Sequence, residues 1–129
     1  MAGKTMSDID FLDIYSCFAS NVNFTRDILG IPDDDPRPLT VTGGLPYFGG
    51  PGNNYTTHSI ASMVELLRDN SGSCGLVTGV GMHMTNHSFA IYSSTAREIT
   101  RGSTGSIANT RVEIAACADG PAVIVGYTV

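Results

Sequence analysis

Basic residues, long apolar runs and paired cysteines are all scarce in this chain. Lys and Arg total seven among 129 residues and the formal net charge is −5, so the sequence lacks the basic patch on which nucleic-acid binding depends. No apolar run approaches the ~20 residues that cross a bilayer, and the first residues contain no apolar segment of the kind found in secretion signals. We therefore expect no nucleic-acid partner and no membrane location.

The cysteines Cys17, Cys74 and Cys117 are odd in number and far apart. This pattern is typical of reduced thiols in a cytoplasmic protein and does not suit a disulfide framework or a zinc site. Apolar residues make up 42% of the chain and charged residues 15%, which indicates a globular protein with a single modest core. We expect a cytoplasmic location and no bound metal.

The most informative stretch combines a short strand, a glycine-rich loop and a helix. Leu39–Thr42 is rich in β-branched residues and predicts the strand. The glycines of the loop, which give its backbone unusual freedom, are Gly43, Gly44, Gly49, Gly50 and Gly52. Apolar residues then recur at helical spacing up to Arg68, namely Ile60, Met63, Val64 and Leu67.

Asn53 or Asn54 is the expected N-cap of this helix. A helix start that follows glycines presents free N–H groups and the positive end of the helix dipole, which suit a phosphate, a thioester oxygen or an enolate. The same arrangement occurs in α/β proteins that bind nothing there, so a purely structural interpretation stays open. Because the stretch has neither Gly-Lys-Ser/Thr nor a tight Gly-x-Gly-x-x-Gly, we expect no nucleotide of the common kinds.

Other parts of the chain supply further strands and helices around this stretch. Ile9–Tyr15 predicts a strand and Ser16–Gly30 a helix, and the proline-rich connector Ile31–Pro38 fits neither. Leu76–Gly81 predicts a buried strand, and His87–Tyr92 alternates as its hairpin partner. The resulting order β-α-β-α-β-β indicates an α/β sheet with parallel strands and one terminal antiparallel hairpin.

Composition divides the chain into three segments. Residues 1–94 contain the alternating strands and helices and form the expected domain. Residues 95–110 are rich in Ser, Thr and Gly and predict a linker. Residues 111–129 return to β-prone residues, and because two strands alone are marginal, we expect the start of a β-rich module there.

Several of these segments resemble the C-terminal part of the thiolase superfamily. Leu12–Ala19 is similar to the segment that reads Asn-Glu-Ala-Phe-Ala in ordinary thiolases and His-Asp-Cys-Phe-Ser in the sterol-carrier-protein type. Residues 43–51 resemble the family's Gly-Gly…Gly-His-Pro loop, and Gly75–Gly81 resembles its strand ending in Cys-Gly-Gly. Residues 10–92 follow the order of a subgroup described as acetyl-CoA acetyltransferase, and residues 111–129 resemble the opening of its small β-rich, OB-like tail.

The resemblance implies a thiolase-like layered α-β-α fragment of an acyltransferase that makes or breaks a C–C bond beside a coenzyme A thioester. Thiolases use a nucleophilic cysteine from their N-terminal half, the histidine of Gly-His-Pro and usually a second cysteine. Gly50 stands where the histidine would be, and Val80 or Gly81 stands near the second cysteine. We therefore expect an incomplete C-terminal piece, inactive alone, with acyl-CoA as its ligand and no covalently bound cofactor.

A second hypothesis is a non-catalytic interaction subunit or a degenerate fragment. A sheet without its first strands leaves an open edge and an apolar helix face. We expect a protein partner, such as another thiolase-like chain, or a second copy of this chain to complete the sheet.

Tyr15 stands at the position of the family's Asn or His, so the resemblance places it in the crevice at the carboxyl end of the sheet. There it would hydrogen-bond a thioester oxygen, or act as an acid or base if its pKa were lowered. The alternative is a half-buried tyrosine at a strand end. The family counterpart of Cys17 is often alanine, so we interpret Cys17 as a small core residue and not as a nucleophile.

His58 is the candidate replacement for the missing histidine, because it lies just inside the loop–helix junction; the alternative is a helix-surface histidine. His87 matches a histidine of the subgroup and is the third candidate catalytic residue. His83 and His87 are spaced as metal ligands on a helix, but they fall in or beside the predicted hairpin without a carboxylate. The expected substrate-binding residues are Gly43, Gly44, Gly49, Gly50, Asn53 and Asn54.

Overall fold

The computed structural model describes residues 3–96, 116–117 and 119–124. Its regular elements are β1 (Phe11–Asp13), α1 (Ala19–Leu29), α2 (Leu45–Phe48), α3 (Tyr55–Asp69), β2 (Cys74–Gly81) and β3 (Asn86–Ser93), with 3-10 turns at Met6–Asp8 and Gly52–Asn54. Within the described residues the strands form one sheet in the order β1-β2-β3, parallel between β1 and β2 and antiparallel between β2 and β3. The predicted α/β fold with a terminal hairpin is confirmed.

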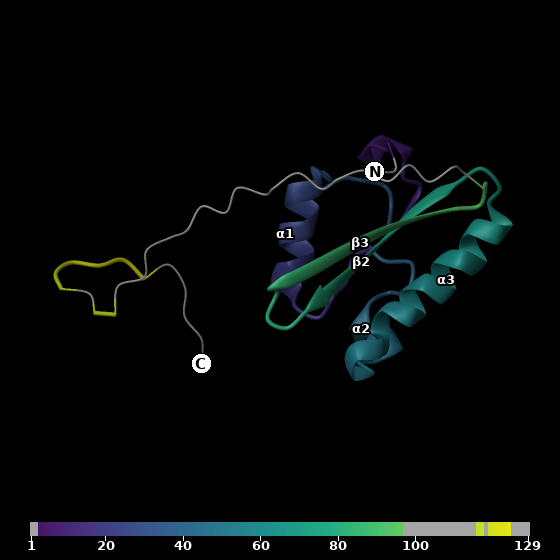
Figure 1. Ribbon diagram of the computed structural model, residues 1–129. Helices are drawn as coiled ribbons and strands as arrows, with labels where there is room; N and C mark the ends of the chain where they lie inside the picture. Colours follow the sequence, from purple (N-terminus) through teal and green to yellow (C-terminus); the bar gives the residue numbers. More distant parts are fainter. Residues whose placement is uncertain (1–2, 97–115, 118, 125–129) are drawn as a thin grey trace.

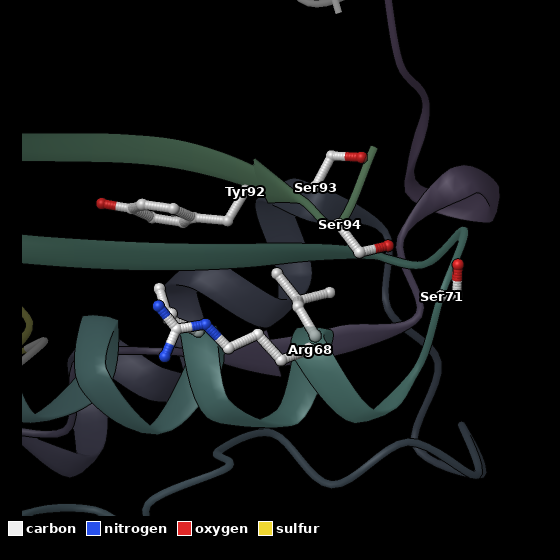
Figure 2. Close-up of a pocket in the computed structure, with 7 residues that line it drawn as sticks. Arg68, Ser71, Tyr92, Ser93 and Ser94 are labelled. Carbon is white, nitrogen blue, oxygen red and sulfur yellow. The ribbon is translucent and has the colours of Figure 1, made fainter. Parts of the chain in front are cut away.

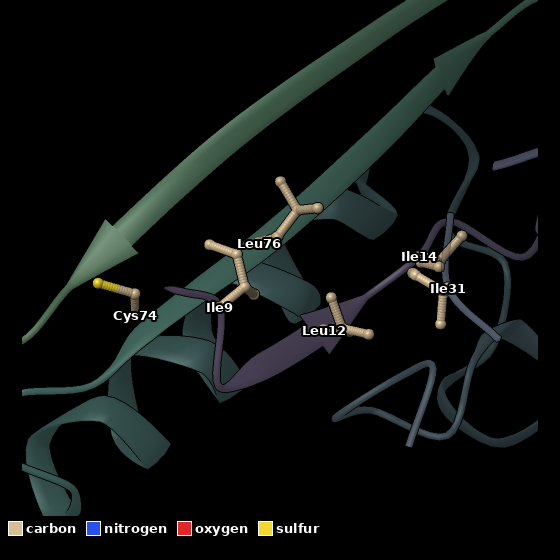
Figure 3. Packing of buried hydrophobic residues seen from close by; sticks show 6 residues of the cluster. All are labelled: Ile9, Leu12, Ile14, Ile31, Cys74 and Leu76. Carbon is tan, nitrogen blue, oxygen red and sulfur yellow. The ribbon is translucent and has the colours of Figure 1, made fainter. Parts of the chain in front are cut away.

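Helices cover both faces of this sheet, α1 on one side and α3 on the other (Figure 1). On the α1 face, Leu12 and Leu76 are paired in register and belong to a buried cluster against which Val22 and Leu29 of α1 pack. Figure 3 shows the buried members of this cluster, which are Ile9, Leu12, Ile14, Ile31, Cys74 and Leu76. The layers are therefore the predicted α-β-α arrangement.

The opposite face is packed by α3, whose apolar stripe the sequence predicts. Met63 and Leu67 are buried against Val77 of β2, and Ile60 packs at the margin of the same cluster. Gly75 allows this close approach, because a Cβ at that position would lie 2.1 Å from the Met63 sulfur. The helix that carries the glycine-rich junction is thus fixed rigidly to the sheet.

The strand predicted at Leu39–Thr42 is wrong. Its only ladder-like bond joins the Leu39 carbonyl to the Ile14 amide, at 2.9 Å. The amides of Val41 and Thr42 instead donate to the Asp13 carboxylate at 3.1 and 3.0 Å. A side-chain acceptor takes the place of a neighbouring strand, so the observed order has one strand fewer than β-α-β-α-β-β.

The glycine-rich segment is also more ordered than a loop, because it contains α2 and the 3-10 turn Gly52–Asn54. The predicted linker at 95–110 and the predicted β-rich tail at 111–129 lie mostly outside the described residues, so both stay predictions. No helix in the described part of the chain is long and apolar enough to cross a membrane.

Candidate functional site

A buried polar network joins the end of β1, the glycine-rich segment and the start of α3. Asp13 is fully buried, and its Oδ2 accepts bonds from the Val41 amide, the Thr42 amide and the Thr42 hydroxyl, the last at 2.9 Å. The Thr42 oxygen also accepts the Gly44 amide at 3.1 Å and lies 2.8 Å from the Tyr55 hydroxyl. Because the single Thr42 proton goes to the carboxylate, the Tyr55 O–H donates to Thr42.

Ser16 completes this network from the other side of the glycine turn. Its Oγ accepts the Leu45 amide at 2.9 Å, and its side chain lowers the pKa of Tyr55, an effect weaker than that of burial. Burial is the main cause that raises the pKa of Tyr55, so this phenol remains protonated and can donate as the network requires. Gly44 has φ +86°, and a Cβ there would lie 2.7 Å from Ser16 Oγ. Both the backbone conformation and the close contact therefore require glycine at position 44.

Tyr15 lies just past the end of β1, beside this network. Its amide donates to Thr78 Oγ1 at 2.9 Å, and its ring meets the Tyr55 ring edge to face with centroids 5.4 Å apart. Burial and, to a lesser degree, Cys17 raise the pKa of Tyr15, so its hydroxyl is protonated at neutral pH. A neutral phenol can donate a hydrogen bond to a carbonyl oxygen, whereas the acid/base role required a lowered pKa.

His58 lies in the first turn of α3 and is half-buried. Its ring packs edge to face against Phe48 of α2 and Tyr55, with centroid separations of 5.4 and 6.0 Å. The structure therefore brings both His58 and Tyr15 against the Tyr55 ring, at the point where the glycine-rich segment enters α3.

His87 lies on a separate part of the same end of the sheet. It is exposed at the start of β3, and its Nε2 is 3.0 Å from the Met84 carbonyl oxygen. It lines a cavity of about 240 Å³ between β2, β3 and the first turn of α3; the lining residues are Thr56, Gly79, Val80, Gly81, Asn86, His87 and Ser88. Thr56 directly follows Tyr55, so this cavity adjoins the α3 start.

The remaining candidates are less closely associated with the network. Gly49, Gly50 and Asn53 are exposed, so they lie on the outer part of the loop. Asn54 is the N-cap residue of α3, but its Oδ1 accepts the Thr57 hydroxyl at 2.6 Å and no backbone amide. The glycine turn at residues 43–44 is thus the part of the loop that the network holds in place.

Neither cysteine near the site has the features of a nucleophile. Burial raises the pKa of the Cys17 thiol, which disfavours the reactive thiolate, and Cys74 is buried in the core. In the described part of the chain, no three His, Cys, Asp or Glu side chains form a group that could hold a metal ion.

A larger cavity, of about 380 Å³, lies at the other end of α3. It is lined by Arg68 in the last turn of α3, by Ser71 just after the helix and by the end of β3 (Figure 2). Figure 2 shows Arg68 and Tyr92 extending along it from opposite walls. None of the candidate residues lines this cavity, so the start of α3 remains the candidate site.

Sequence reasoning missed Asp13, Ser16, Thr42 and Tyr55. The available signal was Asp13, one of two aspartates in the predicted strand Ile9–Tyr15, since such a carboxylate must find hydrogen-bond donors once it is buried. Its donors are the amides of Val41 and Thr42 and the Thr42 hydroxyl, all in the segment predicted as a strand.

A solved structure of a thiolase-like protein is similar to this layered fold. Comparisons with models of protein families and with curated proteins give no match. The crystal structure of a monomeric SCP2-thiolase-like protein type 1 from Mycobacterium smegmatis is similar, with a TM-score of 0.70 and 45% identity over 74% of this chain and 21% of that chain. Over this region the chain is related to thiolase-like proteins of the sterol-carrier type, and it spans about a fifth of the relative's length.

Proposed function

We propose that this chain forms the thioester-binding side of a thiolase-superfamily acyltransferase, which makes or breaks a C–C bond beside a coenzyme A thioester. The observation that carries the proposal is the junction at which Tyr15, the Gly43–Gly44 turn and the start of α3 meet. The positive end of α3 suits a thioester or enolate oxygen. The relation to an SCP2-thiolase-like protein supports the same class.

Each candidate side chain has a distinct part in this proposal. The neutral Tyr15 hydroxyl donates to the thioester carbonyl oxygen, since its raised pKa keeps the proton in place. His58 forms the wall of the site through its contacts with Phe48 and Tyr55. The cavity lined by Thr56 and His87 accommodates the part of the ligand next to the carbonyl.

The nucleophile and the rest of the acyltransfer machinery come, in this proposal, from polypeptide other than the described residues. The thiols of Cys17 and Cys74 do not suit acyl transfer, and Gly50 replaces the family's histidine. The purified chain therefore binds acyl-CoA without turning it over. Cytoplasmic location is part of the same proposal and is tested by cell fractionation.

Isothermal titration of the purified chain with acetyl-CoA and with CoA tests the binding step. We expect measurable affinity for acetyl-CoA, and a folded chain with no affinity for either compound would contradict the proposal. Thiolytic cleavage of acetoacetyl-CoA tests the second step. Turnover at a normal enzymatic rate would show that the chain is a complete enzyme.

The alternative is a non-catalytic interaction subunit that pairs with another thiolase-like chain. It is favoured by one observation, namely that β3 pairs only with β2 among the described strands, so a partner chain could pair with its other edge. Size-exclusion chromatography with and without a second thiolase-like chain separates the two functions. A complex that has no affinity for acetyl-CoA would favour the interaction subunit.

A further inference from the structure

We propose that two copies of this chain associate through β3, whose free edges pair antiparallel around a two-fold axis at Ala90. Among the described residues β3 has β2 as its one neighbour, so no described strand pairs with the N–H and C=O groups of its other edge. This interface is distinct from the acyl-CoA site, and it holds whether or not the proposed function does.

The sequence and register of β3 have none of the features that normally prevent strand pairing. Natural edge strands are protected by Lys or Pro, by bulges, by inward-pointing charges or by a covering segment. The eight residues of β3 include no Lys, Arg, Asp, Glu or Pro. Their register with β2 is unbroken from Asn86 opposite Gly81 to Ser93 opposite Cys74. The strand is therefore long, regular and uncharged along its free edge.

The same strand exposes two large apolar side chains on one face. Phe89 is 55% exposed and Ile91 40% exposed. They are opposite Thr78 and Leu76 in the register with β2. Leu76 belongs to the cluster on the α1 face, and side chains two apart share a face. Phe89 and Ile91 therefore both point to the α1 side of the sheet. The side chains of α1 leave this part of the sheet uncovered.

The sequence of β3 is complementary to itself in one register. In an antiparallel pair, directly opposed residues lie on the same face. A two-fold axis at Ala90 places Phe89 of each copy opposite Ile91 of the other, and symmetry creates this pair twice. Aromatic and β-branched residues are favourable cross-strand partners. Because the exposed residues of one edge match those of the same edge in a second copy, a second copy is the occupant that this surface fits.

The relative from Mycobacterium smegmatis is described as monomeric, but this chain spans 21% of its length. The oligomeric state of that longer protein therefore does not fix the state of this one.

Sedimentation velocity or light scattering of the full chain at micromolar concentrations tests the association. We expect a mass twice the 13.6 kDa of one chain. Ile91→Lys places a charge in the paired face and should reduce the mass to that of one chain. Ile28→Lys is the matched control, because Ile28 is 81% exposed on α1 and away from β3. Circular dichroism confirms that both variants are folded.

A charge exchange tests the register. Phe89→Lys and Ile91→Glu should each yield monomers, whereas an equimolar mixture should recover the double mass, because each new lysine then faces a new glutamate. A monomeric wild-type chain would overturn the proposal, as would equal disruption by Ile28→Lys and Ile91→Lys. Failure of the mixture to associate would overturn the Ala90 register. Association only with a different thiolase-like chain would overturn the second copy as occupant.

Discussion

Replacing Thr42 with valine removes the hydroxyl that links β1, the glycine turn and α3. This hydroxyl is within 2.9 Å of Asp13 Oδ2, 2.8 Å of the Tyr55 hydroxyl and 3.1 Å of the Gly44 amide. Thr42 is 7% exposed, so water cannot easily replace the lost bonds. Valine keeps the branched shape of the side chain but leaves these groups without their partner.

The magnitude follows from the groups that lose a bond. A buried polar group left unsatisfied costs about 1–3 kcal/mol. Asp13 keeps two amide donors, whereas the Tyr55 hydroxyl and the Gly44 amide both lose the Thr42 oxygen. We therefore expect Thr42→Val to lower the free energy of unfolding by roughly 2–4 kcal/mol, which is less than three independent losses would give.

Urea unfolding followed by circular dichroism measures this change, and an unaltered m-value shows that the folded state remains compact. Thr57→Val is the matched control, because Thr57 is exposed and its hydroxyl bonds only to Asn54 Oδ1. The control should change the free energy of unfolding by less than about 1 kcal/mol. If the two variants were equally stable, the buried network would not hold the junction and the reasoning would be refuted.

Three further changes test other parts of the structure. Arg37 lowers the pKa of Asp35 to about 2, below the usual value of about 3.9. Their pairing therefore stabilises the fold above pH ~4, and this stability is lost as pH falls toward 2. Asp35→Asn should flatten this part of the acid-unfolding curve. Gly44→Ala should lower the melting temperature more than Gly49→Ala, because both glycines have positive φ but only Gly44 has a neighbour within 3 Å of the new Cβ. Equal decreases in melting temperature would refute the close contact of Ser16 with the turn. Tyr15→Phe should weaken acetyl-CoA binding about 3–10-fold in calorimetry, because one hydrogen bond is lost, and should leave CoA binding unchanged. Equal effects on both ligands would contradict a bond from the Tyr15 hydroxyl to the thioester carbonyl.

Hydrophobic periodicity was sufficient to predict the elements that pack against each other. The stripe of Met63 and Leu67 in α3 follows from which face of the helix is buried, whereas β3 is exposed or half-buried throughout, so its alternation marks a strand but no buried face. The N-cap at Asn54 and the end of α1 at Gly30 are similarly local features. These predictions needed no knowledge of distant contacts.

The candidate site could be predicted only in part, because its geometry depends on residues far apart in the chain. Asp13 takes the amides of Val41 and Thr42 across 28 and 29 positions, and no local pattern distinguishes a strand from a segment held by a buried carboxylate. The need for glycine at position 44 arises from Ser16, which the sequence does not place beside it. Tyr15 could be located, but its raised pKa depends on burial that appears only in the folded chain.

Titration of acetyl-CoA into the ¹⁵N-labelled chain, followed by amide chemical shifts, tests the central claim most directly. We expect the largest shifts at Tyr15, Gly44 and Thr56, around the glycine turn and the first turn of α3, with little change near Arg68 at the other end of the helix. Shifts concentrated near Arg68, or none at saturating acetyl-CoA, would contradict the claim that this junction faces a coenzyme A thioester.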